Sequence, residues 1–154
     1  MSSIKKNIKG GVRAKKGVKI GIVKSTYNSE ITDVLLSSCL KELKKTGVKN
    51  IKVTEVPGAY ELPFGCKKMI RSKKVDAVIA LGAVIKGQTP HFDFIAKSAS
   101  IGIMNVSLKT NIPIIFGVLT TDNISQAKAR VKGGKRGDKG VEAAQAAIKM
   151  VNIT

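Results

Sequence analysis

The amino-acid sequence predicts a three-layer α/β fold with a central, mainly parallel four-stranded sheet. Short apolar and β-branched runs alternate with longer stretches in which apolar residues recur at helical spacing. The run at residues 75–85 is continuous and apolar, as expected of a strand that is buried on both faces. Strands and helices that alternate in this way favour a parallel sheet with helices on both sides.

The individual elements follow from apolar periodicity and from the glycines and prolines between them. Strands are predicted at residues 18–23, 51–56, 75–85 and 113–119. Helices are predicted at residues 31–45, 62–72, about 91–109 and about 139–150. A further helix is expected to begin at Asn123, because Gln126 follows three residues later, as in a capping box.

Length and composition indicate one globular domain. The chain has 154 residues, of which 43% are hydrophobic and 25% charged, so it can bury a substantial core. We expect a basic N-terminal arm at residues 1–17 and a single domain at residues 18–154. The run at residues 75–85 is too short to span a bilayer, and the N-terminus lacks the pattern of a secretory signal. Cys39 and Cys66 have no metal-ligand spacing, which favours reduced core thiols in a cytoplasmic protein.

The formal net charge is +18, from 28 Lys and Arg against 10 Asp and Glu, and such a charge would suit a nucleic-acid partner. The basic excess lies at the N-terminus and late in the chain, whereas residues 75–125 are balanced. Aromatic residues make up only 4%, and no basic–aromatic pattern offers a stacking surface for bases. A solvated basic exterior is therefore the favoured interpretation.

Ligands of parallel α/β sheets bind beyond the carboxyl ends of the strands, so the segments after the strands are the candidate site. After the third strand comes the segment GAVIKGQTPH, residues 82–91. Gly87 allows the backbone to approach a ligand closely, and Thr89 and Pro90 suit the N-cap and first residue of a helix. The free N–H groups of such a helix start bind anions, most often phosphate. His91, the only histidine, can act as a general acid–base, although capping or packing would explain it equally well.

Two further segments present aromatic and acidic side chains. Residues 56–63, VPGAYELP, form a stiff loop that presents Tyr60 and Glu61, whose carboxylate could bind polyol hydroxyls or amide-like N–H groups. A loop that leads into a helix would by itself explain the prolines and Gly58. After the first strand, Tyr27 could stack on a planar heterocycle or simply pack.

The fourth segment follows the last strand. Phe116 lies within that strand, and Arg130 is expected about two turns into the next helix. Its guanidinium could contact phosphate with two N–H groups, and a surface arginine is the ordinary alternative. Lys139 and Glu142 lie three residues apart in the first turn of the final helix, where they could pair with each other or face a ligand.

Four motifs together resemble the 6,7-dimethyl-8-ribityllumazine synthase family in order and in spacing: VPGAYELP, GAVIKGQTPHFD, IFGVLTTDNISQA and DKGVEAA. The resemblance covers about residues 18–150. Enzymes of this family have a flavodoxin-like fold. They condense 5-amino-6-(D-ribitylamino)uracil with 3,4-dihydroxy-2-butanone 4-phosphate and release phosphate and water, without a metal or an organic cofactor. The resemblance therefore implies the penultimate step of riboflavin biosynthesis.

The resemblance also implies a role for each matching residue. His91 would transfer protons. The phosphate of the butanone would be held by Gln88, Thr89 and Arg130. The aminouracil would be bound by Tyr27, where the family usually has Phe or Trp, and by Ala59, Tyr60, Glu61, Ala83, Val84, Ile85 and Phe116. The supporting residues would be Asn28, Gly58, Gly87, Lys139 and Glu142.

The family's site lies between neighbouring subunits, so the resemblance implies a homo-oligomer. Tyr27 and the His91 loop would come from one chain, and residues 116–130 from the next. We expect a closed pentamer, which many family members assemble into an icosahedral shell, and an N-terminal segment that adds a strand to a neighbouring subunit. Riboflavin synthase is a further candidate partner, and no membrane is expected.

The sequence departs from the usual family pattern in three places. Lys86 stands where arginine is common, and the link from Arg130 to Lys139 is one residue longer than in typical shell-forming members. The charge of +18 per chain would cause self-repulsion in a shell. Two alternatives therefore stay open: another phosphate-binding α/β enzyme, and a shell protein that binds nucleic acid or other anions without turnover.

Overall fold

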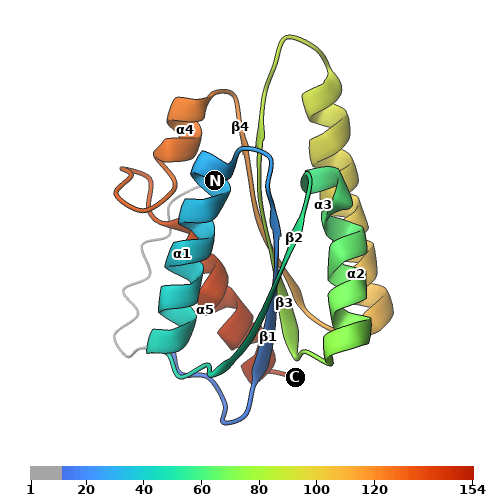
Figure 1. Cartoon of the computed structure of the whole chain (residues 1–154), viewed down its shortest axis with the longest axis vertical. Coiled ribbons are helices and arrows are strands. Elements are labelled where there is room, and N and C mark those ends of the chain that lie inside the picture. Colours follow the sequence, from blue (N-terminus) through green and yellow to red (C-terminus); the bar gives the residue numbers. More distant parts are fainter. Residues whose placement is uncertain (1–11) are drawn as a thin grey trace.

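A computed structural model describes residues 12–154 of the chain, in which strands and helices alternate (Figure 1). The strands are β1 (Lys19–Ser25), β2 (Asn50–Val56), β3 (Ala77–Ile85) and β4 (Ile114–Thr121). The helices are α1 (Ser29–Lys45), the 3₁₀ turn η1 (Ala59–Glu61), α2 (Leu62–Lys73), α3 (His91–Thr110), α4 (Ile124–Lys128) and α5 (Lys139–Asn152). Every element predicted from the sequence is therefore present, with small differences at its ends.

The sheet is parallel throughout, with the strand order β2-β1-β3-β4. Strand β1 pairs on both sides, so that Ile22 lies opposite Val53 of β2 and Ile79 of β3. In β3 every residue before Ile85 is buried, as its continuous apolar sequence predicts. The predicted three-layer, flavodoxin-like α/β class is confirmed.

Helices α1 and α5 cover one face of the sheet, and α2 and α3 cover the other (Figure 1). Successive strand residues point to opposite faces, so Ile79 packs in the core under α1 and α5, whereas Val78 packs under α2 and α3. Helices α1 and α5 lie in close contact at Gly140, because a Cβ there would lie 2.5 Å from the Leu35 carbonyl oxygen. Each face of the sheet thus has its own apolar core.

The two cysteines lie in different cores. Cys39 belongs to α1 and Cys66 to α2, on opposite faces of the sheet, and both are free and buried. Burial raises the pKa of each thiol to about 12, and Asp138 adds to the rise at Cys39. Both thiols therefore stay protonated at neutral pH, and the interpretation that they are reduced core thiols is confirmed for their burial.

Residues 1–11 lie outside the described part of the chain, so the expected added strand and most of the expected basic arm lie there too. From residue 12 onward the chain follows the domain surface, where the Ala14 N–H donates to the Thr46 carbonyl at 3.0 Å. The Asn152 side chain donates to the Arg13 carbonyl at 3.2 Å. Within residues 12–154, none of the helices has the length and apolar character needed to cross a membrane.

Candidate functional site

The parallel sheet brings the carboxyl ends of all four strands to one edge, at the top of Figure 1. Backbone hydrogen bonds continue across this edge after the strands end. The Thr26 N–H donates to the Val56 carbonyl at 2.8 Å, and the Lys86 N–H donates to the Thr121 carbonyl at 2.9 Å. The four segments singled out in the sequence therefore follow neighbouring strands, as a site at this edge requires.

The β1–α1 loop is hydrogen-bonded both to the turn after β2 and to the end of β3. The Tyr27 N–H donates to the Pro57 carbonyl at 2.9 Å, which leaves the Tyr27 side chain 73% exposed. Asn28 adopts the left-handed conformation, with φ of 59°, and its Nδ2 donates to the Ala83 carbonyl at 2.8 Å. The loop thus presents an aromatic ring on a fixed backbone, next to the end of β3.

The turn after β2 uses Glu61 as a structural group. One carboxylate oxygen, Oε2, accepts a hydrogen bond from the Gly58 N–H at 3.0 Å, while the Glu61 N–H donates to the Gly58 carbonyl at 3.1 Å. Ala59 is buried, and Tyr60 is 62% exposed. Both interpretations of this segment are therefore compatible with the structure: Glu61 closes the turn with one oxygen, and its side chain is only partly buried.

The end of β3 leads through an exposed loop to α3. Ala83 and Val84 are buried, so they can meet a ligand only through backbone groups. Residues 86–91 are exposed. Helix α3 begins one residue later than expected, with Pro90 at the N-cap, but the Thr89 hydroxyl still accepts a hydrogen bond from the His91 N–H at 3.4 Å. The first turn of a 20-residue helix thus faces the loop.

The prediction that Arg130 lies inside a helix is wrong. Helix α4 begins after Asn123, whose side chain accepts the Gln126 N–H at 2.8 Å as predicted, but it already ends at Lys128. The Arg130 N–H then bonds to the Ala127 carbonyl, which leaves the Gln126 carbonyl free to accept from the guanidinium Nη1 at 2.8 Å. The α4 end therefore orients Arg130 from just beyond the helix.

Lys139, Glu142 and Phe116 are the remaining predicted positions. Lys139 and Glu142 form an ion pair of 3.0 Å, which is the first of the two alternatives. Phe116 lies opposite Ala80 in the sheet, whereas Ala83 lies opposite Leu119. Phe116 is therefore roughly 10 Å down its strand from the level of Ala83. It lies on the edge strand β4 and is 43% exposed.

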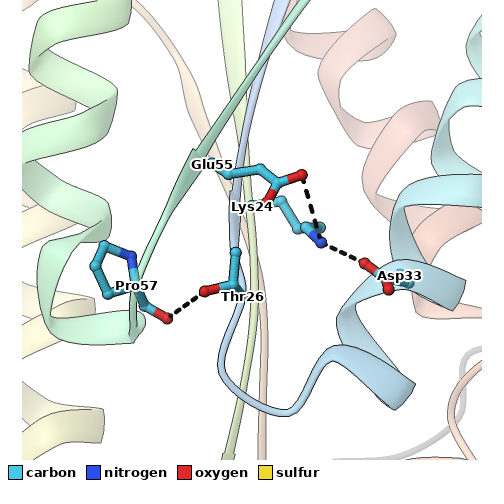
Figure 2. Close-up of polar contacts among 5 residues, drawn as sticks. All are labelled: Lys24, Thr26, Asp33, Glu55 and Pro57. Carbon is cyan, nitrogen blue, oxygen red and sulfur yellow. Dashed lines mark hydrogen bonds and ion pairs between the residues drawn. The ribbon is translucent and has the colours of Figure 1, made fainter.

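Lys24 is a charged residue at this edge that the sequence analysis did not single out. It lies in β1 and is only 3% exposed, and it contacts carboxylates of α1 and β2 (Figure 2). The available signal was a lysine that directly follows the apolar run at residues 18–23, where the predicted strand stopped. Because the observed strand continues to Ser25, this lysine is inside the sheet.

Two hollows in the described residues, of about 380 and 470 Å³, both lie away from this edge. The first is at the opposite end of the sheet, beside Asp76 and Pro113, and the second is beside α1 and β2, at Leu40 and Val53. Residues 12–154 also contain no group of side chains that could hold a metal ion.

An exposed histidine, an oriented arginine and a helix start at the carboxyl ends of the strands are features that suit an α/β enzyme acting on a phosphorylated small molecule. Comparison with known proteins makes the class specific. Residues 17–154 match the family model described as 6,7-dimethyl-8-ribityllumazine synthase. The chain belongs to this family.

Curated relatives agree with the family model over nearly the whole chain. The 6,7-dimethyl-8-ribityllumazine synthase of Protochlamydia amoebophila is 48% identical over 151 residues, which cover 97% of this chain and 87% of the relative. The enzyme of the same name from Clostridium kluyveri is 52% identical over 139 residues, 89% of this chain and 90% of the relative. The predicted family and enzyme class are confirmed, and the alternative of a shell protein without turnover is not favoured.

Gly87 offers a test of ligand approach at the α3 loop. A Cβ at this position would meet no heavy atom within 4 Å, so Gly87→Ala should leave the unfolding temperature unchanged. If the backbone contacts the phosphorylated substrate there, the KM for that substrate should rise about tenfold. Steady-state kinetics and thermal unfolding of the same preparation check both expectations. An unchanged KM would show that no ligand approaches Gly87.

Proposed function

We propose that the carboxyl edge of the sheet is one half of the active site that condenses 5-amino-6-(D-ribitylamino)uracil with 3,4-dihydroxy-2-butanone 4-phosphate. The product would be 6,7-dimethyl-8-ribityllumazine, with release of phosphate and water. The observation that carries this proposal is the arrangement of the segments that follow the four strands, which contain three of the family motifs. Hydrogen bonds of the Thr26, Tyr27, Asn28 and Lys86 groups join these segments.

The aminouracil would bind over β1, β2 and β3. Tyr27, exposed and fixed through its backbone, would stack on the pyrimidine ring. The free oxygen of Glu61 would accept hydrogen bonds from ribityl hydroxyls, beside Ala59 and Tyr60. The heterocycle would meet the backbone of residues 83–85, because the side chains of Ala83 and Val84 are buried. Asn28 and Gly58 would support this half by fixing the two loops.

The butanone phosphate would bind at the start of α3. Gln88, Thr89 and the first N–H groups of the helix would receive the phosphate, and Arg130 of a neighbouring chain would add a two-pronged contact. One guanidinium N–H of Arg130 already donates to the Gln126 carbonyl, so the remaining N–H groups are oriented before the ligand binds. Lys139 and Glu142, paired with each other, would complete the polar side.

The chemistry asked of this site is modest. An amine attacks a carbonyl and an imine forms with loss of water. Phosphate is then eliminated, which leaves a new carbonyl after tautomerisation, and the second amine attacks this carbonyl and closes the ring with loss of a second water. These steps require two substrates held in register, an anion site for the leaving group and a residue that moves protons. His91 is exposed beside the phosphate loop, and it would accept and return these protons.

The exposed face of α3 supports the second half of the proposal, a closed pentamer. Phe94, Ile101, Met104 and Leu108 recur at helical spacing along one side of α3, and each is at least half exposed. Phe64 of α2 is 74% exposed nearby in the same layer. A soluble monomer rarely exposes a stripe of this kind, because about 25 cal/mol is gained for every Å² of apolar surface buried.

A neighbouring chain on this face would also supply what the edge lacks. In a ring, Phe116 on the edge strand β4 and Arg130 beyond α4 would reach the Tyr27 loop of the next chain. We further propose a cytoplasmic enzyme whose product is passed to riboflavin synthase. An icosahedral shell of such rings would carry +18 per chain, which salt or bound anions would have to screen.

Substitution of His91 should lower the rate of lumazine formation, whereas substitution of Arg130 should raise the KM for one of the two substrates. His91→Ala should slow lumazine formation about 100-fold at saturating substrates, since it removes proton transfer. Arg130→Ala should raise the KM for the butanone phosphate about tenfold or more and leave the KM for the aminouracil unchanged. Lumazine fluorescence in steady-state assays measures both effects. A His91→Ala rate equal to wild type would remove His91 from the mechanism.

Assembly should depend on the apolar face of α3. Leu108→Glu should dissociate the oligomer and abolish lumazine formation, while the fold persists because Leu108 is 71% exposed in the single chain. Ser37→Glu on the exposed side of α1 adds the same charge and is the matched control. Sedimentation analysis with circular dichroism checks this, and a Leu108→Glu chain that stays assembled would overturn the proposed interface.

A further inference from the structure

Lys24 is the only Lys or Arg among residues 12–154 that is buried, and its surroundings explain how a charge is tolerated there. Its ammonium contacts Oδ1 of Asp33 in α1 and lies 4.0 Å from Oε1 of Glu55 in β2 (Figure 2). The Lys24 side chain is 4% exposed, whereas the two carboxylates are 63% and 58% exposed. One buried ammonium on β1 thus contacts side chains of both α1 and β2, while the two carboxylates remain exposed to water.

The position of this cluster relates it to the proposed site. Lys24 lies opposite Glu55 in the register of β1 and β2, and three residues before Tyr27. Directly beyond this cluster, the segments that follow β1 and β2 stay joined, because the Thr26 hydroxyl donates to the Pro57 carbonyl at 3.3 Å (Figure 2). The cluster therefore lies directly before the β1–α1 loop and the turn after β2.

Asp33 gives the cluster a second function, because it lies one turn into α1. The β1–α1 loop is tied to β2 and β3 by Tyr27 N–H and Asn28 Nδ2. The helix that follows packs on the sheet through buried residues such as Ile31 and Leu35. The ion pair between Lys24 and Asp33 adds a polar contact near the start of this helix. The loop that carries Tyr27 is thus held at both of its ends.

We propose that Lys24 is a positioning residue for the aminouracil half of the site. Through Asp33 and Glu55 it sets the place of the two loops that carry Tyr27 and Glu61, without touching substrate itself. The loop that carries Thr89 and His91 follows β3 and takes no part in the two ion pairs of this cluster. The inference rests on the proposed division of the site into an aminouracil half and a phosphate half.

The test is the KM for each substrate in Lys24→Met, with Lys52→Met as the control. Methionine fills the same space without a charge, and the exposed Asp33 and Glu55 carboxylates are not left buried and unpaired, so the variant should fold. Lys52 is an exposed residue of β2, and its substitution changes the net charge equally. We expect the KM for the aminouracil to rise at least about fivefold in Lys24→Met, with kcat and the KM for the butanone phosphate within about twofold of wild type.

Asp33→Asn supplies the second arm, because it breaks the same ion pair from the exposed side. It should raise the aminouracil KM in the same direction, and the double variant should be no worse than Lys24→Met alone. Unchanged aminouracil KM values in Lys24→Met, or in Asp33→Asn if Lys24→Met does not fold, would overturn the inference. An equal rise of both KM values would do the same, since it would indicate a general loss of structure. A wild-type chain that forms no lumazine would instead overturn the assigned site, and the inference with it.

Discussion

Burial of β3 on both faces is the constraint on which the rest of the structure depends. Its apolar side chains need helices above and below the sheet, and each fully buried aliphatic side chain contributes about 1.5–3 kcal/mol. A strand covered on both sides is most readily joined to its neighbours by helical crossovers, which make the sheet parallel. A parallel sheet in turn places every strand-to-helix loop at one edge. The site follows from this arrangement, since the four family motifs are those loops and the segments next to them.

The same chain leaves surfaces uncovered that a self-sufficient monomer would bury. Tyr27 at the edge, Phe116 on β4 and Leu108 on α3 are all exposed. These features have one explanation if a second subunit covers them. The surface that brings subunits together and the surface that binds substrates would then be continuous. Catalysis would require assembly because neither chain alone holds all the groups.

Much of this could be predicted from the sequence, because local patterns decide it. The continuous run of β3 and the Asn123 cap each depend on residues close in the chain, and both are confirmed. Arg130 was placed wrongly because α4 ends at Lys128, where the backbone turns and the Arg130 side chain donates to the Gln126 carbonyl. Helical periodicity carries no signal for such a stop. Glu61 also accepts a hydrogen bond from the Gly58 N–H, and the sequence alone does not decide between this structural role and ligand binding.

Long-range placement was beyond sequence reasoning for a different reason. The level of Phe116 in the sheet depends on the register between β3 and β4, which no single strand encodes. The Lys24 cluster depends on three elements that are distant along the chain, and its lysine resembles any strand-end lysine until the strand's true length is known. The roles of the site residues therefore remain proposals, whereas the fold and the family are established.

The central claim is that each site is shared by two chains, and subunit mixing tests it most directly. His91→Ala and Arg130→Ala chains are unfolded together, refolded at equal concentration and assayed for lumazine formation at a butanone phosphate concentration well below the wild-type KM, where both separate variants are slow. Since a shared site can combine an intact His91 from one chain with an intact Arg130 from the next, about a quarter of the sites should be restored by random mixing. Activity of the mixture that stays at the sum of the two separate variants would contradict the account, because it would place both groups in one chain's site.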